Sequence, residues 1–254
     1  MAAGTGQALT ASRWWTPLRP RLTGPVNARL LVAPHAGGGP SSYARVVGEL
    51  PADVEILGLT LPGRERRLGE PAGASLDDVL ASLDDVAGPW PPTVVFGHSL
   101  GASLGLHLAH RLGDRCAGLV ASGQTPSARD RWVDGLATDD ELLRLLDLSG
   151  GTVPEALAHP AWRAAVLDAL RADLRLGAQA AERGAGLRLE VGITAVAGRE
   201  DLLIEVAALP TWSVHTTARC SVHLIDGGHF SIFEPAGRAV VAELVAAVLA
   251  AGRE

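Results

Sequence analysis

Ser99 lies in the pentapeptide Gly97-His98-Ser99-Leu100-Gly101, whose spacing suits a nucleophilic serine. A serine hydroxyl attacks a carbonyl carbon efficiently only when its oxygen is exposed and a nearby base accepts its proton. Glycines two residues before and two residues after the serine permit a sharp turn from a strand into a helix, where the chain approaches itself too closely for a Cβ. An apolar strand pattern precedes this turn and a helical pattern over 100–112 follows it. We therefore predict that Ser99 is a nucleophile.

His229 is the candidate general base. In sheets that carry such a turn the order along the chain is serine, acid, histidine. His229 lies in the glycine-flanked loop 226–230, between the last strand pattern and the last helical pattern. The alternative is a solvated loop histidine. His98 adjoins the nucleophile in a tight turn, so we expect it to point elsewhere and to pack against the protein.

The acid that orients the base should follow a strand and precede the histidine. Asp201 fits, since it follows the strand pattern that ends near Gly198 and lies 28 residues before His229. Glu200 is an adjacent alternative, and both side chains cannot point at one imidazole. Asp226 is a weaker candidate, because aspartate is also a common turn residue.

Two backbone N–H groups are expected to form the oxyanion hole. In this kind of site one belongs to the residue after the nucleophile, here Leu100, and the other to the loop after an early strand. The glycine-rich run 35–39 follows such a strand, and Ala36 is the predicted donor in it. A phosphate-binding loop of the Walker type is excluded, because all 22 basic residues are arginine and the required lysine is absent.

Alternating strand and helix patterns must position these residues. Strands are expected at 28–33, 54–59, 93–96, 117–121, 192–197 and 220–225, and helices at about 42–50, 75–87, 100–112, 202–212 and 235–251. This alternation predicts a mostly parallel central sheet flanked by helices. Together with the glycine-flanked serine turn between a strand and a helix, it predicts an α/β-hydrolase fold. Residues from about 125 to 186 show helical patterns only and are predicted to form a lid inserted into a single domain, 1–254. Residues 1–27 are expected to be an irregular arm, with Trp14 and Trp15 packed on the body.

The composition excludes several classes of protein. The net charge of −6 argues against a nucleic-acid partner, which needs a clustered positive surface. Without lysine there can be no Schiff-base lysine and no anchor for pyridoxal phosphate. The two cysteines, Cys116 and Cys220, lack metal-site spacing, and no stretch of 18 residues is apolar throughout. We expect a cytoplasmic monomer with no metal, no organic cofactor and no membrane association.

With these residues in view, the chain resembles the type II thioesterases that accompany polyketide synthases and nonribosomal peptide synthetases. The motifs that carry the resemblance occur in family order over roughly residues 14 to 245: 34–38, 61–65 with 70–71, 97–102, 148–152, 170–173, 198–201 and 227–230. Two departures are that Leu100 stands where the family often has methionine and that Arg199-Glu200 precede the acid.

The resemblance implies hydrolysis of acyl thioesters on the phosphopantetheine arm of acyl or peptidyl carrier proteins, through an acyl-enzyme on Ser99. The phosphopantetheine would arrive with the carrier protein, so no cofactor is needed. Two alternatives remain open: a carboxylesterase or lipase-like hydrolase of small oxygen esters, and a catalytically inactive hydrolase-fold binding module. The cluster Arg64, Arg66 and Arg67 is either a solvated loop or a contact for an acidic carrier protein.

Overall fold

A seven-stranded sheet forms the centre of the computed structural model, which describes residues 12–20, 25–86, 88–126, 138–149 and 157–252. The strand order is β1-β3-β2-β4-β5-β6-β7. β1 is antiparallel to β3, and all other neighbours are parallel. The strands are β1 (Trp15–Pro17), β2 (Ala28–Ala33), β3 (Val54–Leu59), β4 (Thr93–His98), β5 (Cys116–Ser122), β6 (Ile193–Gly198) and β7 (Cys220–Ile225). The predicted fold class, a mostly parallel sheet flanked by helices, is confirmed.

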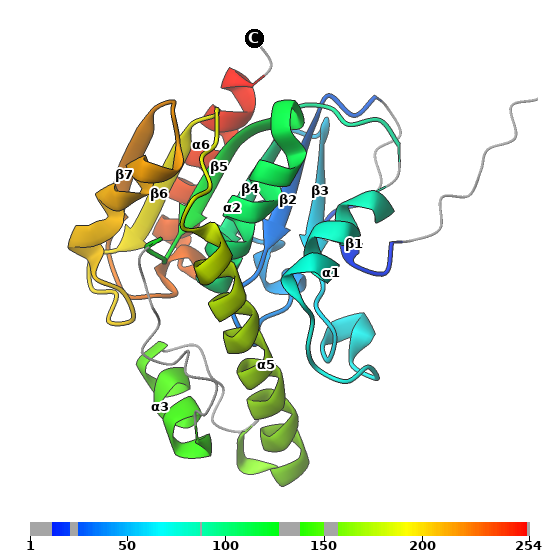
Figure 1. Ribbon diagram of the computed structural model, residues 1–254, viewed down its shortest axis with the longest axis vertical. Helices are drawn as coiled ribbons and strands as arrows, with labels where there is room; N and C mark the ends of the chain where they lie inside the picture. The colour runs from blue at the N-terminus through cyan, green and yellow to red at the C-terminus, as the bar shows by residue number, and fades with distance from the viewer. Residues whose placement is uncertain (1–11, 21–24, 87, 127–137, 150–156, 253–254) are drawn as a thin grey trace, which may run out of the picture.

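Helices cover both faces of this sheet (Figure 1). The α-helices are α1 (Leu76–Ala81), α2 (Leu100–Leu112), α3 (Asp139–Ser149), α5 (Pro160–Gly184) and α6 (Pro235–Ala251). Short 3₁₀ helices are η1 (Pro40–Tyr43), η2 (Glu65–Arg67), η3 (Ser82–Asp85), η4 (Gly113–Arg115), η5 (Val206–His215) and η6 (Ser231–Phe233). One apolar layer packs α1 and α2 on the sheet, and a second packs α6 on the opposite face. Burial on both sides explains why the central strands are almost wholly apolar.

Three expected elements differ from the prediction. The segment 42–50 is not an α-helix, because η1 is followed by turns around Gly48, a residue that disfavours helix. In the segment 202–212 no α-helix forms: residues 202–204 are bends, and the 3₁₀ helix η5 begins only at Val206. η5 contains Pro210, a residue without the N–H that an α-helix interior needs. The helix expected over 75–87 ends as α-helix at Ala81 and continues as η3.

The amino-terminal arm also differs, because Trp15–Pro17 forms the edge strand β1 beside β3. A three-residue strand that ends in proline has too little pattern to be distinguished from a loop in the sequence. Trp15 is 2% exposed, and its indole Nε1–H donates to the Ser82 carbonyl oxygen at 2.9 Å. The described part of the arm around Trp15 therefore packs on the body as predicted, but as a strand.

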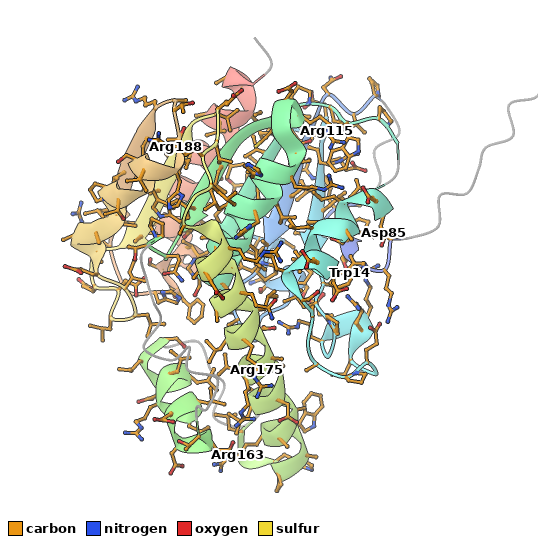
Figure 2. The ribbon with its side chains drawn as sticks, in the orientation of Figure 1. Trp14, Asp85, Arg115, Arg163, Arg175 and Arg188 are labelled. Atoms are coloured by element: carbon orange, nitrogen blue, oxygen red, sulfur yellow. The ribbon has the colours of Figure 1, made fainter. Side chains whose placement is uncertain are left out.

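Between β5 and β6 the described residues form two helices, α3 and α5. α5 has 25 residues, about 37 Å at 1.5 Å per residue. Its carboxyl-terminal half packs on α2, where His107 Nε2 lies 2.8 Å from the Ala180 carbonyl oxygen. Figure 1 shows that its other half and α3 extend past the carboxyl ends of the strands. Figure 2 labels Arg163 on this part of α5 and Arg175 just past the middle of the helix.

The two parts of this inserted segment that lie outside the described residues are 127–137 and 150–156. Part of the motif at 148–152 therefore falls outside them. Where α3 and α5 meet, a small apolar cluster forms from Leu142, Leu145, Leu167 and Leu170. None of the described helices is both long enough and apolar enough to cross a membrane.

Candidate active site

Ser99 occupies the sharp turn between β4 and α2. Its backbone has φ +54° and ψ −120°, a region that residues with a side chain rarely adopt. A Cβ on Gly97 would lie 2.0 Å from the Gly101 carbonyl oxygen, and one on Gly101 would lie 1.8 Å from the Ala33 carbonyl oxygen. These contacts explain why both flanking positions are glycine. The strained turn leaves Ser99 partly exposed at the amino terminus of α2.

His229 and Asp201 form a buried pair beside this turn. His229 Nδ1 lies 2.7 Å from Asp201 Oδ2, and the side chains are 3% and 0% exposed. The other carboxylate oxygen, Oδ1, accepts the Leu203 N–H at 2.9 Å. A Cβ on Gly123 would lie 3.2 Å from His229 Cε1. Gly123 follows Ser122, whose carbonyl oxygen accepts the Ser99 N–H at 2.7 Å, so the imidazole reaches the neighbourhood of the elbow.

The two alternative acids lie elsewhere. Glu200 is exposed, and Asp226 is 97% exposed and pairs with Arg199 at 3.2 Å. Of the three carboxylates weighed in the sequence, the one hydrogen-bonded to His229 is that of Asp201. The structure therefore brings Asp201 and His229 together and leaves Glu200 and Asp226 outside the pair.

His98 is fully buried behind the elbow, as expected of a packing residue. Its Nδ1 lies 3.0 Å from Ser122 Oγ, and its ring centroid lies 4.9 Å from that of His229 and 6.0 Å from that of His35. Burial, followed by repulsion from the other two imidazoles, lowers the pKa of His98 well below its usual value. Burial, with repulsion from His229 and Arg64, lowers the pKa of His35 to about 3. Both rings therefore stay neutral around the candidate base.

A tight turn follows β2 and contains the predicted donor Ala36. The Gly38 N–H donates to the His35 carbonyl oxygen at 3.0 Å, and Gly37 has φ +76°, the sign that the third residue of a type II turn requires. The His35 N–H donates to the Tyr43 hydroxyl at 3.0 Å. Within the described part of the chain, the Ala36 N–H forms no hydrogen bond. It is therefore a donor free to bind a ligand.

Leu100, the second predicted donor, is the first residue of α2. Backbone N–H groups in the first turn of a helix have no partner within the helix, and the positive end of the helix dipole favours negative charge there. A Cβ on Gly101 would lie 2.8 Å from the Pro34 carbonyl oxygen, so the start of α2 adjoins the segment that leads into the turn at Ala36. The two predicted donors thus lie on adjoining segments at the carboxyl edge of the sheet.

The arginine cluster is mostly buried, which neither interpretation of the sequence anticipated. Arg64 is 7% exposed and Arg67 is 4% exposed, whereas Arg66 is exposed. Arg64 pairs with Asp173 of α5, and Arg67 donates to Glu70 and to the Thr60 carbonyl oxygen. Arg64 and Arg67 are therefore buried and form ion pairs within the protein. They belong neither to a solvated loop nor to a surface that could contact a carrier protein.

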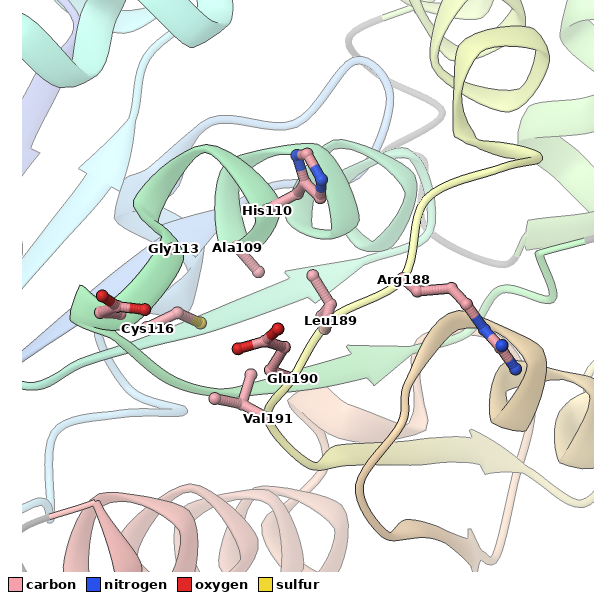
Figure 3. A pocket seen from close by; sticks show the side chains of 9 residues that line it. Ala109, His110, Gly113, Cys116, Arg188, Leu189, Glu190 and Val191 are labelled. Carbon is pink, nitrogen blue, oxygen red and sulfur yellow. The ribbon is translucent and has the colours of Figure 1, made fainter.

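A cavity of about 540 Å³ lies at the opposite, amino-terminal edge of the sheet (Figure 3). Its lining comes from the end of α2, the η4 turn, the start of β5 and the segment before β6. Cys116 lines it, but burial raises the pKa of this thiol to about 11, which keeps the sulfur protonated near neutral pH. Ligands of open α/β sheets bind at the carboxyl ends of the strands, so this cavity is not the candidate active site. Within the described ranges, no three His, Cys, Asp or Glu side chains gather in a way that could hold a metal ion.

Comparison with known proteins places the chain in a family. A model of the thioesterase domain matches residues 28–249. The probable cadicidin biosynthesis thioesterase of Streptomyces griseus is 32% identical over 227 residues, covering 87% of this chain and 62% of that protein. Thioesterase PikA5 of Streptomyces venezuelae is 34% identical over 211 residues, covering 80% of this chain and 74% of that protein. The chain thus spans less than two thirds of the length of the Streptomyces griseus relative.

A solved structure agrees with these relatives. The type II thioesterase BorB from the borrelidin biosynthetic cluster superposes with a TM-score of 0.71 at 25% identity, covering 93% of this chain and 96% of that one. The family model includes every predicted site residue, from the turn after β2 to the loop before α6. The chain belongs to the family of thioesterase domains.

Proposed function

We propose that this protein is a type II thioesterase that hydrolyses acyl thioesters from the phosphopantetheine arm of carrier proteins in polyketide or nonribosomal peptide biosynthesis. The observation that carries the proposal is the buried His229–Asp201 pair beside the strained Ser99 turn. The membership of the thioesterase family and the biosynthetic roles named for the relatives support the substrate class.

In the proposed reaction, Ser99 Oγ attacks the thioester carbonyl carbon while His229 Nε2 accepts the hydroxyl proton. Asp201 holds the Nδ1–H and stabilises the imidazolium without itself taking the proton. The carbonyl oxygen becomes an oxyanion that the N–H groups of Ala36 and Leu100 stabilise. Collapse of this intermediate breaks the C–S bond and leaves the acyl group on Ser99.

The leaving group and the second half-reaction fit the same residues. A thiol has a pKa near 8.5, so the thiolate leaves more readily than an alkoxide and needs little general-acid help. Water then attacks the acyl-enzyme, with His229 again accepting a proton, and the free acid departs. The phosphopantetheine belongs to the carrier protein, so the proposal requires no cofactor bound to this chain.

The substrate class is tested by comparing two acyl donors of equal chain length, an acylated carrier protein and a p-nitrophenyl ester. Release of acyl chains from the carrier protein is followed by intact-protein mass spectrometry. The proposal predicts a kcat/KM for the carrier-bound thioester at least tenfold above that for the oxygen ester. A preference for the oxygen ester would favour a carboxylesterase instead.

The nucleophile is tested with a fluorophosphonate probe, which reacts only with an activated serine. Labelling of the wild type at Ser99, and its loss in Ser99→Ala, are the expected results. Ser103 lies in α2 one turn beyond the elbow, so Ser103→Ala serves as a matched control that should label like the wild type. Absence of labelling in the wild type would indicate an inactive binding module.

A further inference from the structure

Asp173 of α5 connects the lid helix to the turn that contains Ala36. Its Oδ2 accepts the Gly37 N–H at 2.7 Å, although the two residues are 136 positions apart in the chain. The Asp173 side chain is 3% exposed. Leu170, one helical turn earlier, is also buried and approaches Gly37. This is the point at which α5 crosses the predicted oxyanion loop.

Arg64 binds both Asp173 and the same turn. Its Nη1 donates to the Gly38 carbonyl oxygen at 3.0 Å and to Asp173 Oδ2 at 2.6 Å. Its Nη2 donates to Asp173 Oδ1 at 2.8 Å, which completes a two-pronged ion pair. Arg64 and Asp173 together therefore bind the N–H of Gly37 and the carbonyl of Gly38.

These bonds hold the two peptide groups that follow Ala36, those carrying the Gly37 N–H and the Gly38 carbonyl. Type I and type II turns differ by a flip of the central peptide, here the one between Ala36 and Gly37. In the observed turn the Gly37 N–H points at the Asp173 carboxylate. A flip would instead point the Ala36 carbonyl oxygen at this carboxylate, so that a partly negative oxygen would face a negative charge. The carboxylate thus selects the turn observed and holds its backbone against α5. The Ala36 N–H, on the peptide group just before the one that would flip, has no partner within the described residues.

The buried pair is not explained by stability. Desolvating an ion pair offsets much of its attraction, and apolar replacements of both partners are often neutral or stabilising. Arg64 Nε is buried and forms no hydrogen bond within the described part of the chain, which adds a further desolvation penalty. An arrangement that gains so little stability is better explained by the geometry it enforces.

We propose that Arg64 and Asp173 are positioning residues that couple the lid helix to the oxyanion hole. Displacement of the middle of α5 breaks the bond between Asp173 and the Gly37 N–H. The turn can then shift, which moves the Ala36 N–H away from the position of the oxyanion. The lid then controls the chemical step as well as substrate access. This inference rests on the proposed role of Ala36 as an oxyanion donor.

The apolar packing of α3 and α5 also supports a coupling between the lid and the candidate site. Ala36 and Leu203 both pack against the cluster of leucines between α3 and α5. Leu203 donates its N–H to Asp201, so this cluster contacts both the oxyanion turn and the loop that orients the base. One position of the lid therefore supports both parts of the candidate site.

The test compares Asp173→Asn, Arg64→Met and the double variant Arg64→Met/Asp173→Leu in the full chain. For each protein, kcat, KM and Tm are measured, with Arg171→Gln as the control. Arg171 is on the same helix and pairs with Asp139 of α3 at the surface, so its replacement should leave kcat unchanged. The single variants should lose kcat by about 10- to 1,000-fold, the range up to the loss of a whole oxyanion donor.

The double variant separates positioning from buried charge. It leaves no unpaired charge, so Tm should return toward the wild-type value while kcat stays low. Recovery of kcat together with Tm would overturn the proposal, because the defect of the single variants would then be the unpaired charge alone.

Two inhibitors supply a readout that a structural role would not move. An acyl trifluoromethyl ketone adds to the serine and forms an oxyanion, so its affinity should fall by the same factor as kcat/KM. A non-hydrolysable amide analogue forms no oxyanion, and its affinity should change by less than about threefold. Equal losses for both inhibitors would contradict the proposal.

The two proposals fail in different ways. All variants are also assayed with a p-nitrophenyl ester, which any active serine hydrolase of this fold can cleave. A wild type that cleaves only this ester would refute the thioesterase substrate class while still testing the coupling. Wild-type kcat in the double variant would refute the coupling whichever ester is used.

Discussion

Replacing Asp201 with asparagine should abolish activity through the tautomer of His229. In the wild type, Oδ1 of the carboxylate accepts the Leu203 N–H at 2.9 Å and Oδ2 faces His229 Nδ1 at 2.7 Å. An asparagine in this place keeps its oxygen toward the Leu203 N–H, because the opposite orientation would set an NH₂ group against an N–H. The NH₂ group therefore faces the imidazole, and Nδ1 must become the acceptor.

That tautomer carries its proton on Nε2, the nitrogen that accepts the proton of Ser99 in the proposed reaction. His229 then cannot accept the serine proton, although the positions of the non-hydrogen atoms are unchanged. Loss of the correct tautomer in a serine–histidine–aspartate site costs about 10⁴ in kcat, which corresponds to about 5 kcal/mol of barrier. KM and Tm should change little, because asparagine has the size of aspartate and retains the bond to Leu203.

The assay is thiol release from an acyl-pantetheine thioester, with kcat and KM determined separately. Glu200→Gln is the matched control, since Glu200 is the exposed neighbour of Asp201, and its kcat should stay within about threefold of the wild type. If Asp201→Asn kept more than a tenth of the activity, or if Glu200→Gln lost it, the assignment of the acid would be refuted.

Two further predictions concern the elbow and His35. Gly101→Ala should prevent correct folding of the elbow, because the added Cβ would lie 1.8 Å from the Ala33 carbonyl oxygen. The expected readouts are loss of fluorophosphonate labelling and of the near-UV circular dichroism signal. Gly105→Ala in the same helix is the control: its Cβ would meet only side-chain atoms, at 3.0 Å and beyond, so this variant should label normally. The pKa of His35 is about 3 in the folded protein and near 6.5 when unfolded, so below pH 6.5 only the unfolded chain binds this proton and stability falls as the pH decreases toward 3. The free energy of unfolding, measured with urea, should decrease between about pH 7 and pH 5 in both the wild type and His35→Asn. The decrease should be about 2 kcal/mol larger in the wild type than in His35→Asn. Equal decreases in the two proteins would contradict the neutral state of His35.

The predictions that failed share a physical cause. Helices were expected over 42–50 and 202–212 from apolar spacing, but the buried side chains there are held by turns and a 3₁₀ helix whose spacing is similar. β1 has three residues, and its strand state depends on pairing with β3, which lies more than 35 residues away in the chain. Local patterns are weak where tertiary contacts decide the conformation.

Asp173 and Arg64 show the same limit within the site. Both stand in motifs that were recognised in the sequence, at 170–173 and 61–65, yet no spacing indicates that they pair across 109 residues. An exposed surface role is the usual expectation for an arginine-rich loop. Only the packing of α5 against the turn after β2 buries Arg64 and gives it a partner.

The sequence by itself determined the elements whose constraints are local. The elbow around Ser99 follows from two glycines that no other residue could replace, and the sheet follows from apolar strands that alternate with helices. The order serine, acid, histidine then identified His229 as the candidate base and favoured Asp201 as its partner, with Glu200 and Asp226 left open as alternatives.

The tertiary structure decided what depends on direction and distance between remote segments. It buries Asp201 against His229 and exposes Glu200, although the two acids are adjacent in the chain. It also sets α5 against the Ala36 turn through Asp173, which is held in a buried ion pair with Arg64. A sequence pattern records which residues are available, whereas the side chain that reaches a given atom is fixed only when the whole chain is packed.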